Sequence, residues 1–336
     1  MLLAFILVAL CIQDNAAELT RVQFGGTASE LVISEVSDRT VRVDLLAADA
    51  ALQNPGPTLA TVLVPFPSTE KFRARDLAGE QKLSVGRLQI VIKPRPLTVT
   101  IRRADGRLVQ ELVFGAGDDR EVAFRTEAPV FGLGEGAQQF DRRGARYSME
   151  PSWGGWNRPV LGSVVPSPFL IGTDGWALFA SQPEGEFDLR DWKGRFLPKT
   201  AGALSLFVVD VQEPVDALTE YIRLAGHPVM PPKWALGYFQ SHRTLGGPDE
   251  PLEIARIFRE KKLPCDALIY LGTGYCTNGW NTGHGSLVFN PNAFPHPAEN
   301  IAALHALNFK VVLHVNHAPR NLFGASITEN SDSPIH

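Results

Sequence analysis

The chain has 336 residues, of which 44% are hydrophobic and 20% are charged, with a formal net charge of −4. This length is enough for two domains, because single hydrophobic cores stop growing at about 250–300 residues. The balanced charge, with no run of like charges and no basic stripe, argues against a nucleic-acid-binding surface.

The chain begins with an apolar segment, Leu2 to Ile12, and no basic residue precedes it. Its length fits the core of a signal peptide and is too short to span a bilayer. Small residues follow at Ala16 and Ala17, where cleavage is expected. We therefore expect residues 1–17 to be a signal peptide and the protein to be secreted or periplasmic. An apolar first strand is the alternative interpretation.

Residues 18–228 have the pattern of a β-domain. Val41, Val43 and Leu45 alternate with polar residues, which is typical of a half-buried strand. Two pairs of apolar segments are joined by turn sequences, Asp105-Gly106 and residues 172–175, and predict hairpins. Strands are expected at residues 41–45, 88–92, 97–101, 108–112, 169–171, 176–179 and 204–209. With hardly any helix, this region predicts an antiparallel β-sandwich.

One helix closes this β-domain. It is expected from Asp216 to Leu224, with Gly226 as its stop signal. Pro228, Pro231 and Pro232 follow, and they cannot continue a helix. The prolines predict a stiff connector to a second domain.

Residues 229–336 alternate between strand and helix patterns. Strands are expected at residues 234–239, 267–271 and 311–315, and helices at residues 252–262 and 301–307. Near-continuous apolar strands separated by amphipathic helices indicate a parallel sheet that is buried on both faces.

Several motifs resemble glycoside hydrolase family 31. They are PKWALGYFQ at residues 232–240, IFREKKLPCD at 257–266, FNPNAFPHP at 289–297, Leu304-His305 and, upstream, FGLGE at 131–135 and PFLIG at 168–172. The resemblance implies a galactose-mutarotase-like β-sandwich followed by the first part of a (β/α)8 TIM barrel. It also implies a retaining α-glycosidase that hydrolyses O-glycosyl bonds in an oligosaccharide or α-glycoside, with no cofactor and no metal.

Residues 232–336 are too few for a complete barrel. A whole barrel takes about 250 residues, so about three of eight strands are expected here. The resemblance implies two catalytic aspartates at later strand ends, about 5–5.5 Å apart. We therefore expect the nucleophile and the acid/base beyond His336, and no hydrolysis by this chain alone. A non-catalytic carbohydrate-binding module and a transglycosylase of the same family are the alternatives.

Substrate contacts are expected at the carboxyl ends of the strands, where barrel active sites gather. The second strand end departs from the family, because residues 269–275 lack the aspartate that members usually carry there. A Gly-rich aromatic loop in the β-domain is a further candidate for substrate contact. The alternative is that this loop is a hairpin that only packs on its own sheet. The substrate-binding candidates are Gln240, His242, Arg243, Thr273, Tyr275, Trp280, Trp156 and Arg158.

Histidines and cysteines point to no further chemistry. His314 and His317 have no third ligand at suitable spacing, so no metal is expected, and His314 is predicted as a strand residue with a hydrogen-bonded ring. Cys265 and Cys276 flank a predicted strand and are therefore too far apart for a disulfide. Both are expected to be reduced thiols.

Overall fold

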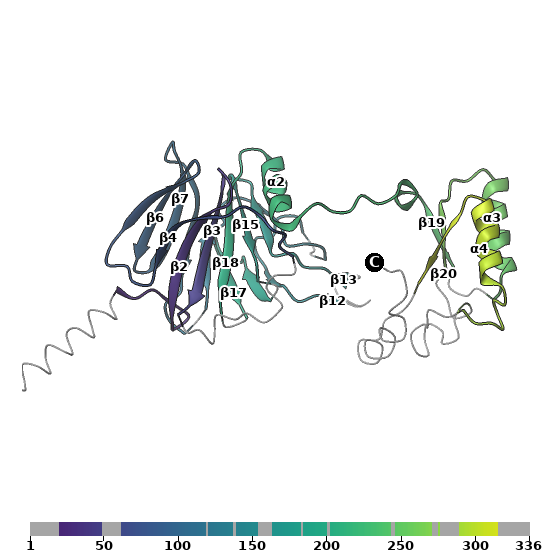
Figure 1. Ribbon diagram of the computed structural model, residues 1–336, viewed down its shortest axis with the longest axis horizontal. Coiled ribbons are helices and arrows are strands. Elements are labelled where there is room, and N and C mark those ends of the chain that lie inside the picture. The colour runs from purple at the N-terminus through teal and green to yellow at the C-terminus, as the bar shows by residue number, and fades with distance from the viewer. Residues whose placement is uncertain are drawn as a thin grey trace, which may run out of the picture. The chain divides into compact units, whose positions relative to one another are not determined.

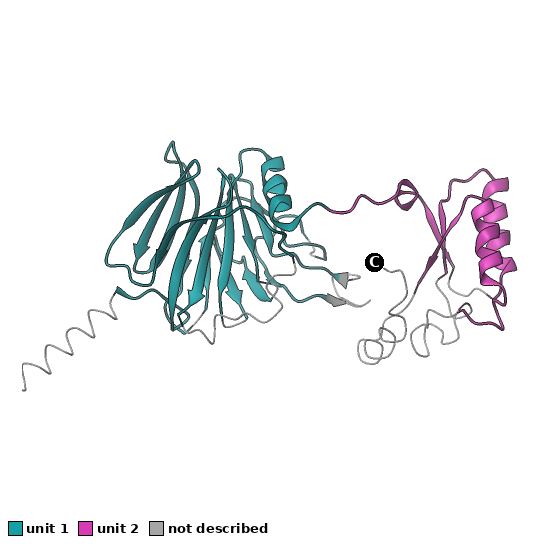
Figure 2. Ribbon diagram, viewed as in Figure 1, with its two compact units in different colours: residues 1–227 teal, residues 228–336 magenta. Residues whose placement is uncertain are grey.

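The computed structural model describes residues 20–48, 62–118, 120–136, 139–153, 163–182, 184–199, 202–242, 246–270, 275 and 289–314. The chain divides into two compact units, residues 1–227 and residues 228–336 (Figure 2). In the described part of the chain, no helix is long and apolar enough to cross a membrane. The predicted signal peptide lies outside the described residues and stays a prediction.

The first unit is built around two eight-stranded antiparallel sheets (Figure 1). The first sheet follows the order β1 (Gln23–Phe24), β2 (Thr27–Glu35), β3 (Thr40–Ala47), β18 (Leu204–Asp210), β15 (Trp176–Ala180), β14 (Phe169–Gly172) and β10 (Val130–Gly132), and β4 (Thr69–Ala74) pairs with β2. The second follows the order β11 (Arg146–Ser148), β16 (Gly185–Asp188), β17 (Lys193–Pro198), β9 (Val122–Arg125), β8 (Leu108–Phe114), β7 (Leu97–Arg103), β6 (Leu88–Pro94) and β5 (Gln81–Val85). The predicted β-sandwich is confirmed.

One continuous apolar cluster fills the space between these sheets. Val43 from β3 and Ile90 from β6 are both buried in it, so alternate residues of each sheet point inward. Phe124 from the second sheet packs edge-to-face on Trp176 from the first, with ring centroids 6.1 Å apart. The core of the unit therefore spans both sheets.

Both hairpins predicted from turn residues are present. β7 and β8 pair antiparallel across a turn in which Gly106 has a φ of 85°, a value that favours glycine. β14 and β15 pair with Phe169 opposite Phe179, and their turn contains Gly175 with a φ of 105°.

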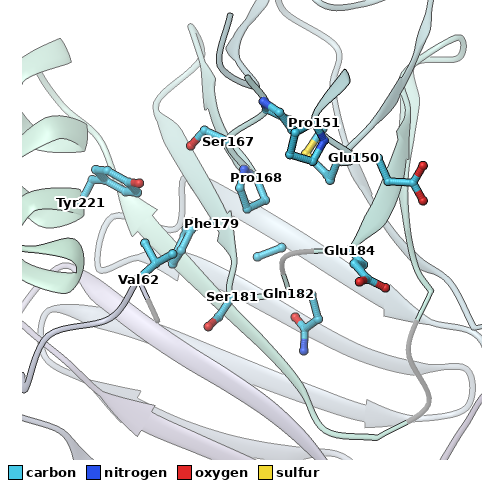
Figure 3. Close-up of a pocket in the computed structure, with 13 residues that line it drawn as sticks. Val62, Glu150, Pro151, Ser167, Pro168, Phe179, Ser181, Gln182, Glu184 and Tyr221 are labelled. Carbon is cyan, nitrogen blue, oxygen red and sulfur yellow. The ribbon is translucent and has the colours of Figure 1, made fainter. Parts of the chain in front are cut away.

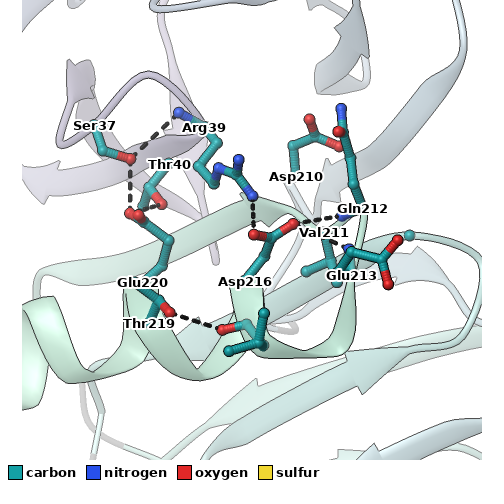
Figure 4. Close-up of polar contacts among 12 residues, drawn as sticks. Ser37, Arg39, Thr40, Asp210, Val211, Gln212, Glu213, Asp216, Thr219 and Glu220 are labelled. Carbon is teal, nitrogen blue, oxygen red and sulfur yellow. Dashed lines mark hydrogen bonds and ion pairs between the residues drawn. The ribbon is translucent and has the colours of Figure 1, made fainter.

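Helix α2 (Pro214–Ala225) covers the outer face of the first sheet. Tyr221 stacks on Phe169, with ring centroids 4.6 Å apart. The buried Glu220 carboxylate accepts hydrogen bonds from Ser37 Oγ (2.6 Å) and Thr40 Oγ1 (2.7 Å), as Figure 4 shows. The helix begins two residues before and ends one residue after the predicted bounds, Asp216 to Leu224. Gly226 follows it as the predicted stop signal, with a φ of 81° and its N–H donated to the Ile222 carbonyl.

The second unit contains a parallel sheet in the order β19 (Phe239–His242), β20 (Ala267–Tyr270) and β21 (Lys310–Leu313). Helix α3 (Asp249–Glu260) connects β19 with β20, and α4 (Pro297–Ala306) precedes β21. Leu268 and Tyr270 of β20 pack with Ala255 of α3 and Leu304 of α4 in one apolar cluster. The alternation of strand and helix is thus confirmed.

The first strand of this sheet was expected at residues 234–239, and this is wrong. Lys233–Leu236 form a short 3-10 helix, and the strand begins only at Phe239. Pro232 sets an extended backbone before the turn, and Ala235 donates its N–H to the Pro232 carbonyl (2.8 Å). Trp234 then stacks on Phe239 with ring centroids 5.7 Å apart, so the apolar run packs on itself.

Cys265 precedes β20 as a free, buried thiol, and desolvation by burial raises its pKa. The second cysteine of the predicted pair, Cys276, lies outside the described residues. The prediction of reduced thiols is thus met at Cys265 alone.

Candidate functional site

The candidate site is the carboxyl edge of the parallel sheet in the second unit. The register aligns His242, Tyr270 and Leu313 in one row at the ends of β19, β20 and β21. Parallel strands with helical connections present their carboxyl ends together, and loops leaving that edge form ligand sites in α/β proteins. The edge therefore collects the segments that follow each of the three strands.

The sheet register decides which face each residue occupies. Gln240 pairs with Leu268, and Leu268 pairs with Val311; both of these apolar residues pack on the side that carries α3 and α4. Because paired residues of adjacent strands share a face, Gln240 lies on the helix-bearing side. Its amide is engaged there: Tyr238 Oη donates to Gln240 Oε1 (2.8 Å), and Gln240 Nε2 donates to the Ser241 carbonyl (2.8 Å).

Ser241 occupies the opposite face. It pairs with Ile269, which pairs with Val312, and none of the three belongs to the helix-side cluster. Ser241 is exposed, whereas Ile269 and Val312 are half-buried. In a closed barrel this face points inward. The Ser241 hydroxyl is therefore better placed than the Gln240 amide to contact a ligand inside the barrel.

Tyr275 joins the ends of two strands. Its ring is buried, lies 5.9 Å from the Tyr270 ring and 5.7 Å from the Phe289 ring, and its hydroxyl donates to the His314 carbonyl. The segment after β20 is thereby fixed against the residue that follows β21. The predicted sugar contact of Tyr275 stays a prediction, and its observed contacts are those of a core residue.

A buried polar chain supports β20 from the helix side. Tyr270 Oη donates to Asn300 Oδ1 (2.7 Å), and Asn300 Nδ2 donates to the Pro248 carbonyl (2.7 Å) at the start of α3. Burial raises the pKa of the Tyr270 phenol well above its usual range, so the hydroxyl stays a proton donor. These bonds tie β20, α3 and α4 together below the carboxyl edge.

His314 follows β21 directly, and its N–H donates to the Tyr270 carbonyl (3.0 Å). The prediction placed it inside the strand with its ring hydrogen-bonded; it stands one residue beyond the strand, and the predicted ring hydrogen bond stays a prediction. Among the residues that the structure describes, no group of three or more histidine, cysteine or acidic side chains is arranged to hold a metal ion.

Carboxylates are scarce along this edge. The sequence from residue 271 to residue 296, which follows β20, contains no aspartate and no glutamate. After β21 the sequence supplies only Glu329 and Asp332. After β19, Asp249 and Glu250 lie in the first turn of α3, where Glu250 Oε2 accepts the Gly246 N–H (2.9 Å). The segment that follows β20 therefore supplies no carboxylate to this edge.

Several predicted contacts lie outside the described residues. These are Arg243, Thr273, Trp280, Trp156 and Arg158, together with the side chain of His242. Their assignments stay predictions.

The Gly-rich aromatic loop of the first unit begins and ends in a small sheet of its own. β12 (Ser152–Trp153) pairs antiparallel with β13 (Ser163–Val164) and joins neither large sheet. The neighbouring residues Met149–Pro151 and Pro166–Pro168 line a largely apolar cavity of about 510 Å³ together with Tyr221 of α2 (Figure 3). The segments that flank β12 and β13 therefore line this cavity.

Residues 228–331 match the family model for the glycosyl hydrolases family 31 TIM-barrel domain. The chain is 27% identical over 282 residues to alpha-glucosidase 2 of Bacillus thermoamyloliquefaciens, covering 76% of this chain and 34% of that protein. It is 23% identical over 252 residues to an alpha-xylosidase of Saccharolobus solfataricus, covering 74% of this chain and 34% of that protein. The chain therefore spans about a third of the length of these curated relatives.

Solved structures show the same fold. A Flavobacterium johnsoniae family 31 dextranase complexed with isomaltotriose matches with a TM-score of 0.68 and 20% identity, over 85% of this chain and 36% of that chain. A xylosidase from Aspergillus niger matches with a TM-score of 0.68 and 17% identity, over 93% of this chain and 46% of that chain. The sandwich followed by βα units is thus a shared architecture.

Proposed function

Because the chain belongs to glycoside hydrolase family 31, we propose that it forms the N-terminal part of a retaining α-glycosidase. The observation that carries this proposal is the parallel β19–β20–β21 sheet with α3 and α4 packed on one face, inside the region that matches the family's barrel. Such a sheet is the opening of a (β/α)8 barrel, whose active site forms at the carboxyl ends of the strands.

The proposed reaction proceeds in two steps. A carboxylate attacks the anomeric carbon while a carboxylic acid protonates the departing glycosidic oxygen, and a covalent glycosyl-enzyme forms. The conjugate base of that acid then takes a proton from water, whose oxygen displaces the carboxylate from the anomeric carbon. Both steps invert the centre, so the configuration is retained overall. The two carboxyl groups must lie about 5–5.5 Å apart.

We place this carboxylate pair outside the 336 residues. The absence of acidic residues between residues 271 and 296 supports this assignment, because no carboxylate can then follow β20 closely. A barrel also needs about 250 residues, which is more than the second unit contains. The nucleophile and the acid/base are therefore proposed to come from later strands of a longer protein.

The substrate is proposed to be an α-linked glucoside, xyloside or oligosaccharide. Relatives carry the names alpha-glucosidase and alpha-xylosidase, and a dextranase of the same fold is complexed with isomaltotriose. We keep Arg243, Thr273 and Trp280 as proposed sugar contacts at the carboxyl edge, together with His242, although its pairing with Tyr270 gives it the same face as Gln240. We add Ser241 because it lies on the face opposite the helices. Trp156 and Arg158 of the first unit stay candidates.

We also propose that the protein is exported, on the strength of the apolar segment at residues 2–12. N-terminal sequencing of protein produced in its native host tests this directly. A mature chain starting near residue 18 is expected, and a chain that retains Met1 contradicts the proposal.

The test of the hydrolase proposal compares two proteins on aryl α-glucoside and aryl α-xyloside. One is the 336-residue chain, and the other extends it with the coding sequence that follows in the source genome. We expect turnover only by the extended protein, with the α-anomer as the first product seen by proton NMR. Turnover by the 336-residue chain, or no extended reading frame, overturns the proposal.

Two variants of the extended protein refine the test. Arg243→Ala is expected to lower kcat/KM by at least about tenfold, or about 1.4 kcal/mol, if the side chain holds the sugar. Arg256→Ala is the matched control, because Arg256 is an exposed residue of α3. Equal activity of both variants removes Arg243 from the site. Transfer of the glycosyl group to added sugar rather than water identifies a transglycosylase instead.

A further inference from the structure

A depression of about 410 Å³ lies on the first unit at the turn between β16 and β17. Trp192, in that turn, lines the depression together with Asp141, Arg143, Arg190 and Asp191. All of these residues belong to the described part of the chain. The depression thus combines one large aromatic ring with several charged groups.

Trp192 is exposed although its backbone is fixed. The residue is 64% exposed, which is unusual for a tryptophan. Its carbonyl nevertheless accepts two hydrogen bonds, from Thr126 N (3.0 Å) and Thr126 Oγ1 (2.9 Å), and Thr126 is fully buried. The turn is therefore anchored to the interior, and the indole extends into solvent from a fixed backbone position.

The two arginines of the depression are held in place by carboxylates. Arg143 donates to Asp141 Oδ2 from Nε (3.0 Å) and from Nη2 (2.7 Å). Its Nη1 donates to the Glu127 carbonyl (2.7 Å). Arg190 donates from Nε (2.9 Å) and Nη2 (2.8 Å) to the buried Asp188. A guanidinium has five N–H donors, so each arginine keeps unused donors in a fixed plane.

Asp191 supplies an acceptor. Its carboxylate makes no hydrogen bond or ion pair with the described residues, and the residue is exposed. The lining contains two arginines, Arg143 and Arg190, against three carboxylates, Glu127, Asp141 and Asp191. Because these charges nearly balance with a slight negative excess, the depression favours a neutral polar ligand over an anion.

We propose that this depression binds a neutral saccharide, with one sugar ring stacked on the Trp192 indole. A pyranose has an apolar face of C–H groups that covers an aromatic ring, and hydroxyls around its rim that both donate and accept. Asp191 accepts from these hydroxyls, and the unused N–H groups of Arg143 and Arg190 donate to them. The choice of an α-glucan as ligand rests on the proposed function of the chain.

The test is a titration of the 336-residue chain with isomaltotriose and maltotriose, followed by the indole N–H signals of its six tryptophans. The Trp192 signal is assigned by its loss in Trp192→Phe. We expect that signal to shift on titration, and Trp192→Ala to weaken binding at least about tenfold. Trp192→Phe keeps a ring and is expected to weaken binding less. Asp191→Ala is expected to weaken it as well.

Phe140→Ala is the matched control, because Phe140 is 87% exposed in the same unit and does not line the depression. It is expected to bind both sugars as the unaltered chain does. The thermal unfolding temperatures of all variants should equal that of the unaltered chain, since Trp192, Phe140 and Asp191 are all exposed. Absence of binding to either sugar overturns the proposal, as does binding that Trp192→Ala leaves intact.

This titration involves no bond cleavage, so its outcome is separate from that of the hydrolase test. Binding that depends on Trp192 stands even if the extended protein hydrolyses nothing. Hydrolysis by the extended protein stands even if Trp192 binds no sugar.

Discussion

The two units bury their sheets in different ways. In the first unit one sheet packs on the other, and α2 covers the outer face of the first sheet around Phe179 and Phe207. In the second unit the described helices α3 and α4 pack on the same face as Leu268, while Ile269 and Val312 on the other face are only half-buried. Within the described residues, the sandwich is closed, whereas helices cover the parallel sheet on one face.

The two units also differ in the polar groups that they bury. The first unit buries charged groups such as Asp188, Asp210 and Glu220, each with hydrogen-bonding partners. Among the described residues of the second unit, no charged side chain is buried. Apart from the tyrosines, its buried polar side chain is that of Asn300, which is neutral. Parallel sheets normally have both faces covered, and unpaired strand edges promote association. We infer that the first unit is the more stable of the two.

Removing the largest core ring should test the independence of the first unit. Trp176 is buried, and Gly172 leaves room for its indole, since a Cβ there would lie 2.2 Å from Cε2 of Trp176. Trp176→Ala is expected to lower the free energy of unfolding by about 3–5 kcal/mol. Urea unfolding measures this loss, and hydrogen exchange locates it. Protection of α3 and α4 should not change.

Trp176→Phe is the control for that substitution. The indole N–H has no hydrogen-bond partner in the described part of the chain, so phenylalanine removes an unsatisfied donor and keeps an aromatic ring. A small loss is expected. Equal losses in both variants contradict the packing argument, and reduced protection of α3 shows that the two units share stability.

A buried charge of the first unit gives the next largest effect. Asp188 Oδ2 accepts from Arg146 Nε (3.2 Å), Arg190 Nη2 (2.8 Å) and Arg195 Nη2 (3.0 Å), and Asp188 is 2% exposed. Asp188→Asn is expected to cost about 2–3 kcal/mol, because the arginines lose their shared anion but stay partly hydrated. Urea unfolding measures the cost.

Asp191→Asn in the same hairpin serves as the comparison, because that carboxylate is exposed. A change within about 0.5 kcal/mol is expected. If both variants unfold at the same urea concentration, the Asp188 cluster does not stabilise the sandwich.

The sequence predicted much of this difference between the units. Val41, Val43 and Leu45 alternate with polar residues because one face of β3 is buried, and the Asp-Gly turn before Arg107 needs the positive φ that glycine allows. Such signals are local, so they can be found without an alignment. The first barrel strand was misplaced because Trp234 stacks on Phe239, and an apolar run does not distinguish a turn that packs on itself from a strand.

The site was harder to predict, because it depends on register between distant segments. Gln240 follows the first strand pattern and is polar, yet its pairing with Leu268 places it on the helix side. Periodicity gives the alternation within one strand but not which of its faces meets the helices. The Tyr270–Asn300 bond joins residues 30 positions apart and has no local signal.

That bond gives the second unit its own prediction. Tyr270→Phe removes the hydroxyl and leaves Asn300 Oδ1 buried without its donor, at a cost of about 1–2 kcal/mol. Hydrogen exchange should become faster in β20 and α4, while β15 and β18 keep their protection. Tyr238→Phe is the matched control, since its hydroxyl bond to Gln240 is exposed. Equal acceleration in both variants argues against a structural role for the bond.

Acid should lower the stability of the sandwich more than that of the second unit. This is the smallest of the four effects on stability that we predict. The carboxylates whose pKa is lowered include Asp141, which Arg143 brings from 3.8 to about 2, and Asp188, held low mainly by Arg190. A lowered pKa means that the folded state binds fewer protons than the unfolded state. The stabilisation is therefore complete above about pH 4 and is lost as the pH falls toward 2.

Urea midpoints of unfolding, measured in steps between about pH 4 and pH 2, should fall less steeply in Asp141→Asn than in the unaltered chain. The difference should be small and should shrink with added salt, because the Asp141 side chain is 38% exposed. Hydrogen exchange over the same range separates the units. If the protection of α3 and α4 falls by more than that of the sandwich strands over this pH range, acid does not act through these carboxylates, and the charged interior is not what distinguishes the two units.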